Sequence, residues 1–122
     1  MANEINVSAT LSVFKSPPMS IPEARSLAFQ AFNFTGSIIS EGFLSLSGST
    51  PTVIPLQGMT TPHWFWFYNP SNGNLVKIRN GSGGADFLAL AANEFAVGAM
   101  ITTCVPYAVS SGTTLEYIII DT

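Results

Sequence analysis

The stretch 63-HWFWFYNPSN-72 decides how the fold of this chain is interpreted, because it begins with six ring-bearing residues in succession. A strand that buries one face alternates apolar with polar residues. Here the rings divide evenly between the two faces of the strand: His63, Phe65 and Phe67 against Trp64, Trp66 and Tyr68. A two-layer sandwich gives a strand only one core face, so the second face of this strand needs a cover of its own.

The segment 113-TTLEYIIID-121, near the end of the chain, has the same property. Its apolar residues also divide between two faces: Leu115, Tyr117 and Ile119 on one, and Ile118 and Ile120 beside Glu116 on the other. The sequence leaves four candidate covers for the second face of these strands. They are a long loop, the N-terminal segment, a ligand and another subunit.

The N-terminal segment 4-EINVSATLSVFK-15 alternates cleanly, which predicts a long, half-buried strand. Its apolar positions are Ile5, Val7, Ala9, Leu11 and Val13. A loop is expected over 16-SPPMSIPE-23, because its three prolines would interrupt a β-ladder.

The next segment, 23-EARSLAFQAFNFTG-36, admits both a helix and a strand. Ser20 and Glu23 have the spacing of a helix capping box. The residues near its end favour a strand instead: Phe29, Phe32, Phe34 and Thr35. We prefer the strand, with a β-bulge between Ala31 and Phe32 to account for the change of parity.

Gly and Pro recur roughly every eight to twelve residues, which is the turn spacing of an all-β sandwich or barrel. The Asn69–Asn74 turn is expected to return the chain antiparallel to the aromatic strand, and the Gly81–Gly84 turn to reverse it again. Further strands are expected over these ranges: 37–48, 52–57 (at a sheet edge), 75–80, two within 86–101 around a turn at 92–94, and 105–109. The total of about nine or ten short strands predicts an all-β, antiparallel two-sheet sandwich of the jelly-roll type, as a single domain over 1–122.

The chain is sparsely charged. Only 9% of its residues are charged, against roughly 25% in an average protein, and the net charge is −3. Four basic residues do not form the basic stripe that nucleic-acid binding requires. A neutral, small-residue surface suits a protein whose outside packs against other protein, because a soluble monomer normally carries a mixed charged surface. We also expect no secretory signal, since the chain starts MANEINVSAT, and no segment that crosses a membrane.

The sequence offers little for catalysis. His63 is the only histidine and Cys104 the only cysteine, so a transition-metal site and an internal disulfide are not expected. The seven carboxylates are scattered, and 80-NGSGGAD-86 lacks the pattern of a phosphate-binding loop. We therefore predict a protein that is not an enzyme and has no cofactor, with His63 and Cys104 in structural roles.

A carbohydrate-binding module is the alternative from a different functional class. Exposed aromatic rings on a β-sandwich stack on flat partners such as sugars. The candidate residues for this role are Trp64, Trp66, Tyr68 and Asn69.

Several strand-and-turn patterns in the last two-thirds of the chain carry a resemblance to a known family. They are Trp64, Phe67, Asn69, Asn74, Val76 and Ile78, then Phe87, Leu88, Leu90, Glu94 and Ala96, then Pro106–Ala108 and Leu115–Ile118. With these residues the chain resembles the small virion proteins of tailed bacteriophages that decorate or cement the capsid. It departs from their pattern in the turn before Asn74 and at Asn93, where glycine is usual.

The resemblance implies a jelly-roll subunit, a homotrimer, seated on a capsid lattice. The expected function is a virion structural protein, made in the host cytoplasm, that contacts itself and the major capsid protein. A tail, baseplate or fibre-attachment subunit is the alternative within that class. Residues 1–25 are the candidate interaction arm, and the candidate interface residues are Ile5, Val7, Leu11, Phe14, Pro17, Pro18, Met19, Phe65, Phe67, Ile118 and Ile120.

Overall fold

The computed structural model describes residues 4–13, 23–33, 38–70 and 74–121, the first two ranges by their backbone alone. The chain divides into two compact units, Met1–Thr35 and Gly36–Thr122. The sequence predicted one domain over 1–122, with only residues 1–25 set apart as an arm. The structure instead assigns the second strand to the N-terminal unit as well, because that strand pairs with the first.

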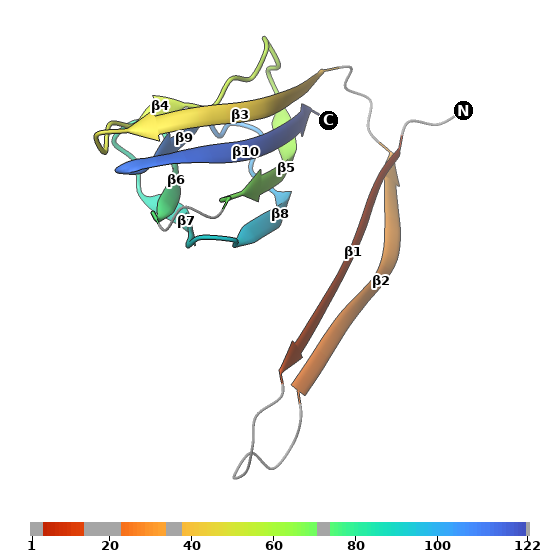
Figure 1. Cartoon of the computed structure of the whole chain (residues 1–122). Helices are drawn as coiled ribbons and strands as arrows, with labels where there is room; N and C mark the ends of the chain where they lie inside the picture. Colours follow the sequence, from red (N-terminus) through yellow and green to blue (C-terminus); the bar gives the residue numbers. More distant parts are fainter. Residues whose placement is uncertain (1–3, 14–22, 34–37, 71–73, 122) are drawn as a thin grey trace. The chain divides into compact units, whose positions relative to one another are not determined.

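The N-terminal unit contains an antiparallel hairpin of β1 (Glu4–Val13) and β2 (Glu23–Asn33) (Figure 1). The preference for a strand over a helix in β2 is therefore confirmed. A bulge is present, but its position differs from the prediction. Val7 pairs with Gln30 and Ala9 pairs with Leu27, so two steps along β1 correspond to three steps along β2. The extra residue of β2 therefore lies between Leu27 and Gln30, and not at 31–32.

The described residues of the second unit form eight strands in two antiparallel sheets. The β10 sheet has the order β3-β10-β5-β8: β3 (Ile39–Ser47), β10 (Gly112–Asp121), β5 (Pro62–Tyr68) and β8 (Phe95–Ala99). The β6 sheet has the order β4-β9-β6-β7: β4 (Thr52–Val53), β9 (Pro106–Val109), β6 (Val76–Asn80) and β7 (Asp86–Leu90). The described residues contain no helix that is long and apolar enough to cross a membrane.

The pairing of these eight strands is nested. β3 pairs with β10, β4 with β9, β5 with β8, and β6 with β7, as if one long hairpin had been rolled into two layers. This is the jelly-roll arrangement, and the predicted fold class is confirmed. One local prediction was wrong, since β6 does not return beside β5. The two strands lie in different sheets, and β6 pairs with β7 and β9.

The core lies between the two sheets and is built from the inward positions of both. Its buried residues are Leu46, Ile54, Met59, Phe67, Val76, Ile78, Leu90, Met100, Cys104, Ala108, Leu115, Tyr117 and Ile119. β10 lies between β3 and β5, and its burial alternates along its whole length, as period-two side-chain packing requires. Tyr117 of this strand lies opposite Gly42 of β3, whose missing side chain leaves room for the phenol ring.

The turn between β7 and β8 contains a residue in a backbone conformation that glycine usually adopts. Asn93 has a φ of 69°, in the left-handed region where glycine is the usual residue. Asn tolerates this conformation better than most other residues. The Glu94 carboxylate accepts a hydrogen bond from the Ala91 N–H at 2.8 Å, which closes the turn. Asn93 therefore fits this turn without a glycine.

Candidate functional site

The outward side of the β10 sheet is the candidate site. The register of its four strands places their outward residues in three rows that cross the sheet. The rows are Ile39, Ile120, Trp64 and Ala99, then Glu41, Ile118, Trp66 and Val97, then Phe43, Glu116, Tyr68 and Phe95. We call these twelve residues the aromatic face. Ten of the twelve are apolar or aromatic, so this face differs in kind from a normal solvent-facing side of a sheet.

The aromatic face is uncovered within its unit. Phe43 is 70% exposed, Phe95 59% and Ile39 53%. The rings also contact one another, since Trp66 stacks on Phe95 with centroids 5.3 Å apart and planes at 22°. An exposed apolar surface that spans four strands indicates a site for protein or another apolar partner.

The only charged side chains on the aromatic face are acidic. Glu41 lies opposite Ile118, and Glu116 lies between Phe43 and Tyr68. A shallow depression of about 340 Å³ brings both carboxylates to one place, together with Phe43 and Ile118. The face therefore combines apolar rings with local negative charge.

The outward side of the β6 sheet has a different character. Both ion pairs found among the described residues lie there: Arg79 Nε to Asp86 Oδ1 at 2.8 Å, and Lys77 Nζ to Asp86 Oδ2 at 3.8 Å. This sheet thus carries the two basic residues of the second unit. The two layers are asymmetric, with charge on one outer side and aromatic rings on the other.

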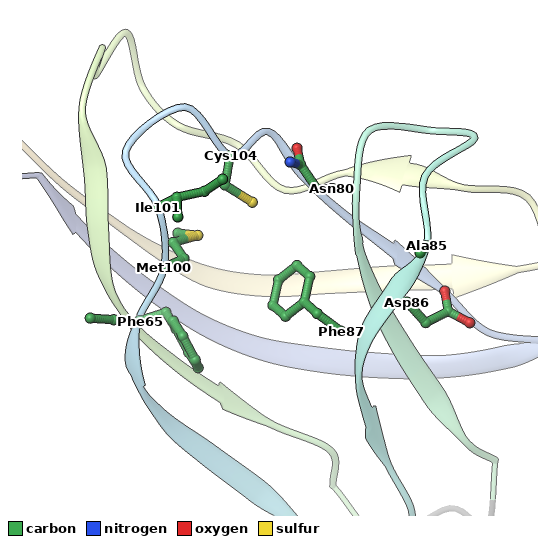
Figure 2. Close-up of a pocket in the computed structure, with 9 residues that line it drawn as sticks. Phe65, Asn80, Ala85, Asp86, Phe87, Met100, Ile101 and Cys104 are labelled. Carbon is green, nitrogen blue, oxygen red and sulfur yellow. The ribbon is translucent and has the colours of Figure 1, made fainter.

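A second hollow, of about 560 Å³, lies at one end of the sandwich (Figure 2). Phe65, Phe87, Met100 and Cys104 are among the residues that line it, and Figure 2 shows the Phe87 ring facing the segment that carries Met100, Ile101 and Cys104. Burial raises the pKa of the Cys104 thiol. At neutral pH the thiol is therefore protonated, and it forms a weakly polar part of the wall of this hollow. The hollow has no convergent set of ionised groups, because the one carboxylate that lines it, Asp86, is held by Arg79.

His63 has a structural position. Its Nδ1 lies 2.6 Å from the carbonyl oxygen of Met100, and the Met100 N–H donates to the His63 carbonyl at 2.8 Å. These two contacts extend the pairing of β5 beyond the end of β8. Among the described residues, no group of three or more His, Cys, Asp or Glu side chains is placed to hold a metal ion.

Two of the predicted interface residues do not lie on the outer surface. Phe67 is 0% exposed and belongs to the core, so its assignment to a subunit interface was wrong. Phe65 lies on the same inward side, is half-buried and packs against the core. The strand had two apolar faces, and the sequence could not show which one faced the second sheet.

The other predicted residues of the two strands meet on one surface. Ile118 and Ile120 share the aromatic face with Trp64, Trp66 and Tyr68, so the interface and the sugar hypotheses converge on the same place. Asn69 does not belong to it. This residue is 0% exposed, and its amide donates to the carbonyls of Asn74 at 2.8 Å and Leu90 at 2.9 Å. Its assignment to sugar binding was wrong, because an amide that is buried and engaged in this way cannot contact a ligand.

The predicted residues of the arm lie in or beside the hairpin. Ile5, Val7 and Leu11 occupy β1 at positions of the same parity. The remaining four, Phe14, Pro17, Pro18 and Met19, lie outside the described residues.

Sequence analysis missed four large apolar members of the aromatic face: Ile39, Phe43, Phe95 and Val97. The parity of these residues was visible in 37-SIISEGF-43 and 94-EFAVGA-99. Only the strand order, which places β3 and β8 on either side of β10 and β5, brings them to one surface.

Comparison of this chain with protein-family models, with curated proteins and with solved structures finds no match. The strand order and pairing define the class by themselves: a small jelly-roll sandwich with one aromatic outer face.

Proposed function

We propose that this protein is a structural subunit of a phage virion that decorates the capsid and stabilises it by protein–protein contacts. The observation that carries the proposal is the aromatic face, an apolar surface on four strands. Phe43, at its border, is the most exposed large hydrophobic side chain among the described residues. The sparse charge of the chain supports the same role. The resemblance to phage decoration proteins adds the virion as the place where the contacts are made.

Burial of apolar surface would supply the binding energy. Each Å² of apolar surface removed from water is worth roughly 25 cal/mol, and a specific interface buries about 1,600 Å² in total. A contact of that size, repeated at every site of a lattice, adds to the stability of the whole shell. The same physics would serve a tail, baseplate or fibre-attachment subunit, so the location within the virion is tested separately.

Co-sedimentation with expanded, undecorated shells of the parent phage tests the proposal. The full chain should pellet with the shells at a saturable ratio and raise their melting temperature. If the chain binds tails and does not bind shells, the proposed location is wrong and the protein is a tail subunit.

A matched pair of variants tests the role of the aromatic face. Val97 on β8 is 43% exposed and Val53 on β4 is 46% exposed, and both strands end their sheets. Val97→Lys should weaken shell binding or self-association at least tenfold, because it places a cation within the apolar face. Val53→Lys should leave both unchanged. Equal effects of the two variants would contradict the proposal.

Trp66 and Tyr68 are half-buried on the outward side of the β10 sheet, which leaves a carbohydrate-binding role as the second candidate function. A glycan that stacks on these rings should quench or shift the tryptophan emission in a saturable titration. Trp66→Ala should abolish that response. A flat titration with host glycans would remove this candidate.

A further inference from the structure

We infer that the aromatic face is the docking surface for the β1–β2 hairpin of a second copy of this chain. The inference rests on the self-association in the proposed function and deepens it, because it names both surfaces of the contact. It does not depend on the virion.

The hairpin has one mainly apolar side. The five apolar residues of β1 share a parity, and the register sets Phe32 opposite Ile5 and Leu27 opposite Ala9. The other β2 residues on this side are Gln30, Arg25 and Glu23. The positions of the other parity carry small or polar residues, with Asn6 opposite Ala31 and Thr10 opposite Ser26. The bulge in β2 produces this arrangement, because Phe32 and Leu27 have different parity and would otherwise fall on opposite sides.

An isolated two-stranded hairpin is marginally stable in water, and it gains stability when its apolar side packs on another sheet. The hairpin forms a compact unit separate from the sandwich. Each unit therefore has one mainly apolar side of a sheet, identified by register in the hairpin and by register and exposure in the sandwich. Sheets of this kind pack face to face at about 10 Å.

The dimensions of the two surfaces agree. β1 and β2 have 10 and 11 residues, and the two longest strands of the aromatic face, β3 and β10, have 9 and 10. A hairpin of this length can follow these strands from end to end. Strands that differed by several residues would leave apolar side chains beyond the contact.

One cation of the hairpin can pair with the acids of the aromatic face. On the side that the apolar residues of β1 share, Arg25 lies opposite Leu11, and Glu23 lies opposite Val13 at the start of β2. On the aromatic face, Glu41 and Glu116 border one depression. The two cations of the sandwich lie on the β6 sheet and are engaged by Asp86, so the cation we assign to these acids is Arg25, by its register position on β2.

A second copy provides a partner for both surfaces in every chain, and docking within one chain is the contrary outcome of the cross-linking test below. Each copy gives its hairpin and receives another, so each association buries two hairpin contacts and not one. Exchange of an identical element between protomers is a low-cost route to closed oligomers.

Charge reversal tests the contact in the full chain. Arg25→Glu, and separately the double change Glu41→Lys with Glu116→Lys, should each weaken self-association at least tenfold by sedimentation equilibrium. The chain that carries all three changes should regain it, because the charges are exchanged and remain complementary. Lys77→Glu is the matched control on the β6 sheet and should leave the mass unchanged.

Three outcomes of this experiment would overturn the inference. The first is an unmodified chain that stays monomeric at every concentration. The second is a loss caused by the glutamate changes but not by Arg25→Glu, which indicates that two aromatic faces pack on each other. The third is no recovery in the triple variant while its melting temperature equals that of the unmodified chain.

Cross-linking identifies the copy that supplies the hairpin. In a Cys104→Ala background, Leu11→Cys chains are mixed with Ile118→Cys chains and treated with a flexible bis-maleimide. A covalent dimer of the two species is expected, well above the yield from either species alone. If the mixture gives no more dimer than the single species, the hairpin does not dock on a second copy and the inference fails. Successful cross-linking without shell binding would instead leave the inference standing and remove the virion role.

Discussion

Gly84 occupies a position in the turn between β6 and β7 where no side chain fits. A Cβ atom built there would lie 1.8 Å from the carbonyl oxygen of Asn80, which is backbone and cannot rotate away. The same residue's amide donates to the Gly81 carbonyl at 3.3 Å. Asn80 in turn accepts a hydrogen bond from the Val105 N–H through its side chain, at 3.0 Å, so a shift of Asn80 would extend to the segment before β9.

Gly84→Ala should therefore destabilise the sandwich by about 3 kcal/mol, within the range of mutations that strain a backbone. Gly83→Ala is the control, because nothing lies within 4 Å of a Cβ at that position. The control should change the free energy of unfolding by less than about 0.5 kcal/mol. Urea denaturation measures both, and equal losses would contradict the geometry of this turn.

Asn69 acts as a buried connector at the end of β5. Besides its two donated hydrogen bonds, its Oδ1 accepts one from the Thr113 hydroxyl at 3.3 Å. Asn69→Ala leaves two carbonyls and a hydroxyl without this partner, and we expect a loss of about 3 kcal/mol. Asn69→Asp should cost more at neutral pH, because a carboxylate would face two carbonyl oxygens.

The stability that the Asn69→Asp variant loses should depend on pH. The introduced carboxyl group would have a higher pKa in the folded state than in the unfolded state, since its charged form is disfavoured there. The penalty should shrink as the pH falls, because protonation restores one donor. The difference in melting temperature between the variant and the unmodified chain, measured from pH 7 to pH 4, tests this. A difference that grows toward acid pH would show that the amide is not needed as a donor.

Cys104 should make stability fall at alkaline pH. Burial raises its pKa above the ordinary value of 9.0. The folded state thus holds the proton more tightly than the unfolded state, and this contribution is complete below pH 9 and lost as the pH rises through the folded pKa. Cys104→Ala should remove that part of the decline. Identical alkaline profiles of the two chains would show that the thiol does not contribute.

At the scale of elements, position within the sheets decides which strands resist opening. β10 lies between two strands, whereas β3, β8, β4 and β7 each have one open edge. Hydrogen exchange should be slowest at Leu115, Tyr117 and Ile119, which are buried on the core side of β10. Exchange of β8 amides as slow as those of β10 would indicate a further strand added to the open edge of β8.

The elements also show what the sequence could predict. Strand existence followed from alternation and turn residues, and both the aromatic strand and the final strand were located to within a few residues. Pairing was harder, because a short link such as Asn69–Asn74 suggested a hairpin, whereas the chain crosses there from one sheet to the other. Phe67 was misplaced for a related reason. Parity divides the residues of a strand into two sets, but only the position of the second sheet decides which set is buried.

At the scale of the whole molecule, the two units should be separable. The core of thirteen buried residues lies within 46–119 and therefore within the second unit. Residues 36–122 should fold with a cooperative transition close to that of the full chain. A truncated chain that fails to fold would show that the hairpin is part of the folding unit.

The truncated chain should also behave differently in solution, because it retains the aromatic face and loses the hairpin that we propose as its cover. We expect a folded species that no longer forms the specific oligomer. Its emission should lie to the red of that from the full chain, since Trp66 on the open face is returned to water. Adding a separate peptide of residues 1–35 should shift the emission to the blue and restore association, with the Arg25→Glu peptide as control. If the truncated chain kept the full oligomer, contacts within the sandwich alone would hold the assembly, and the aromatic face would then be covered by another aromatic face.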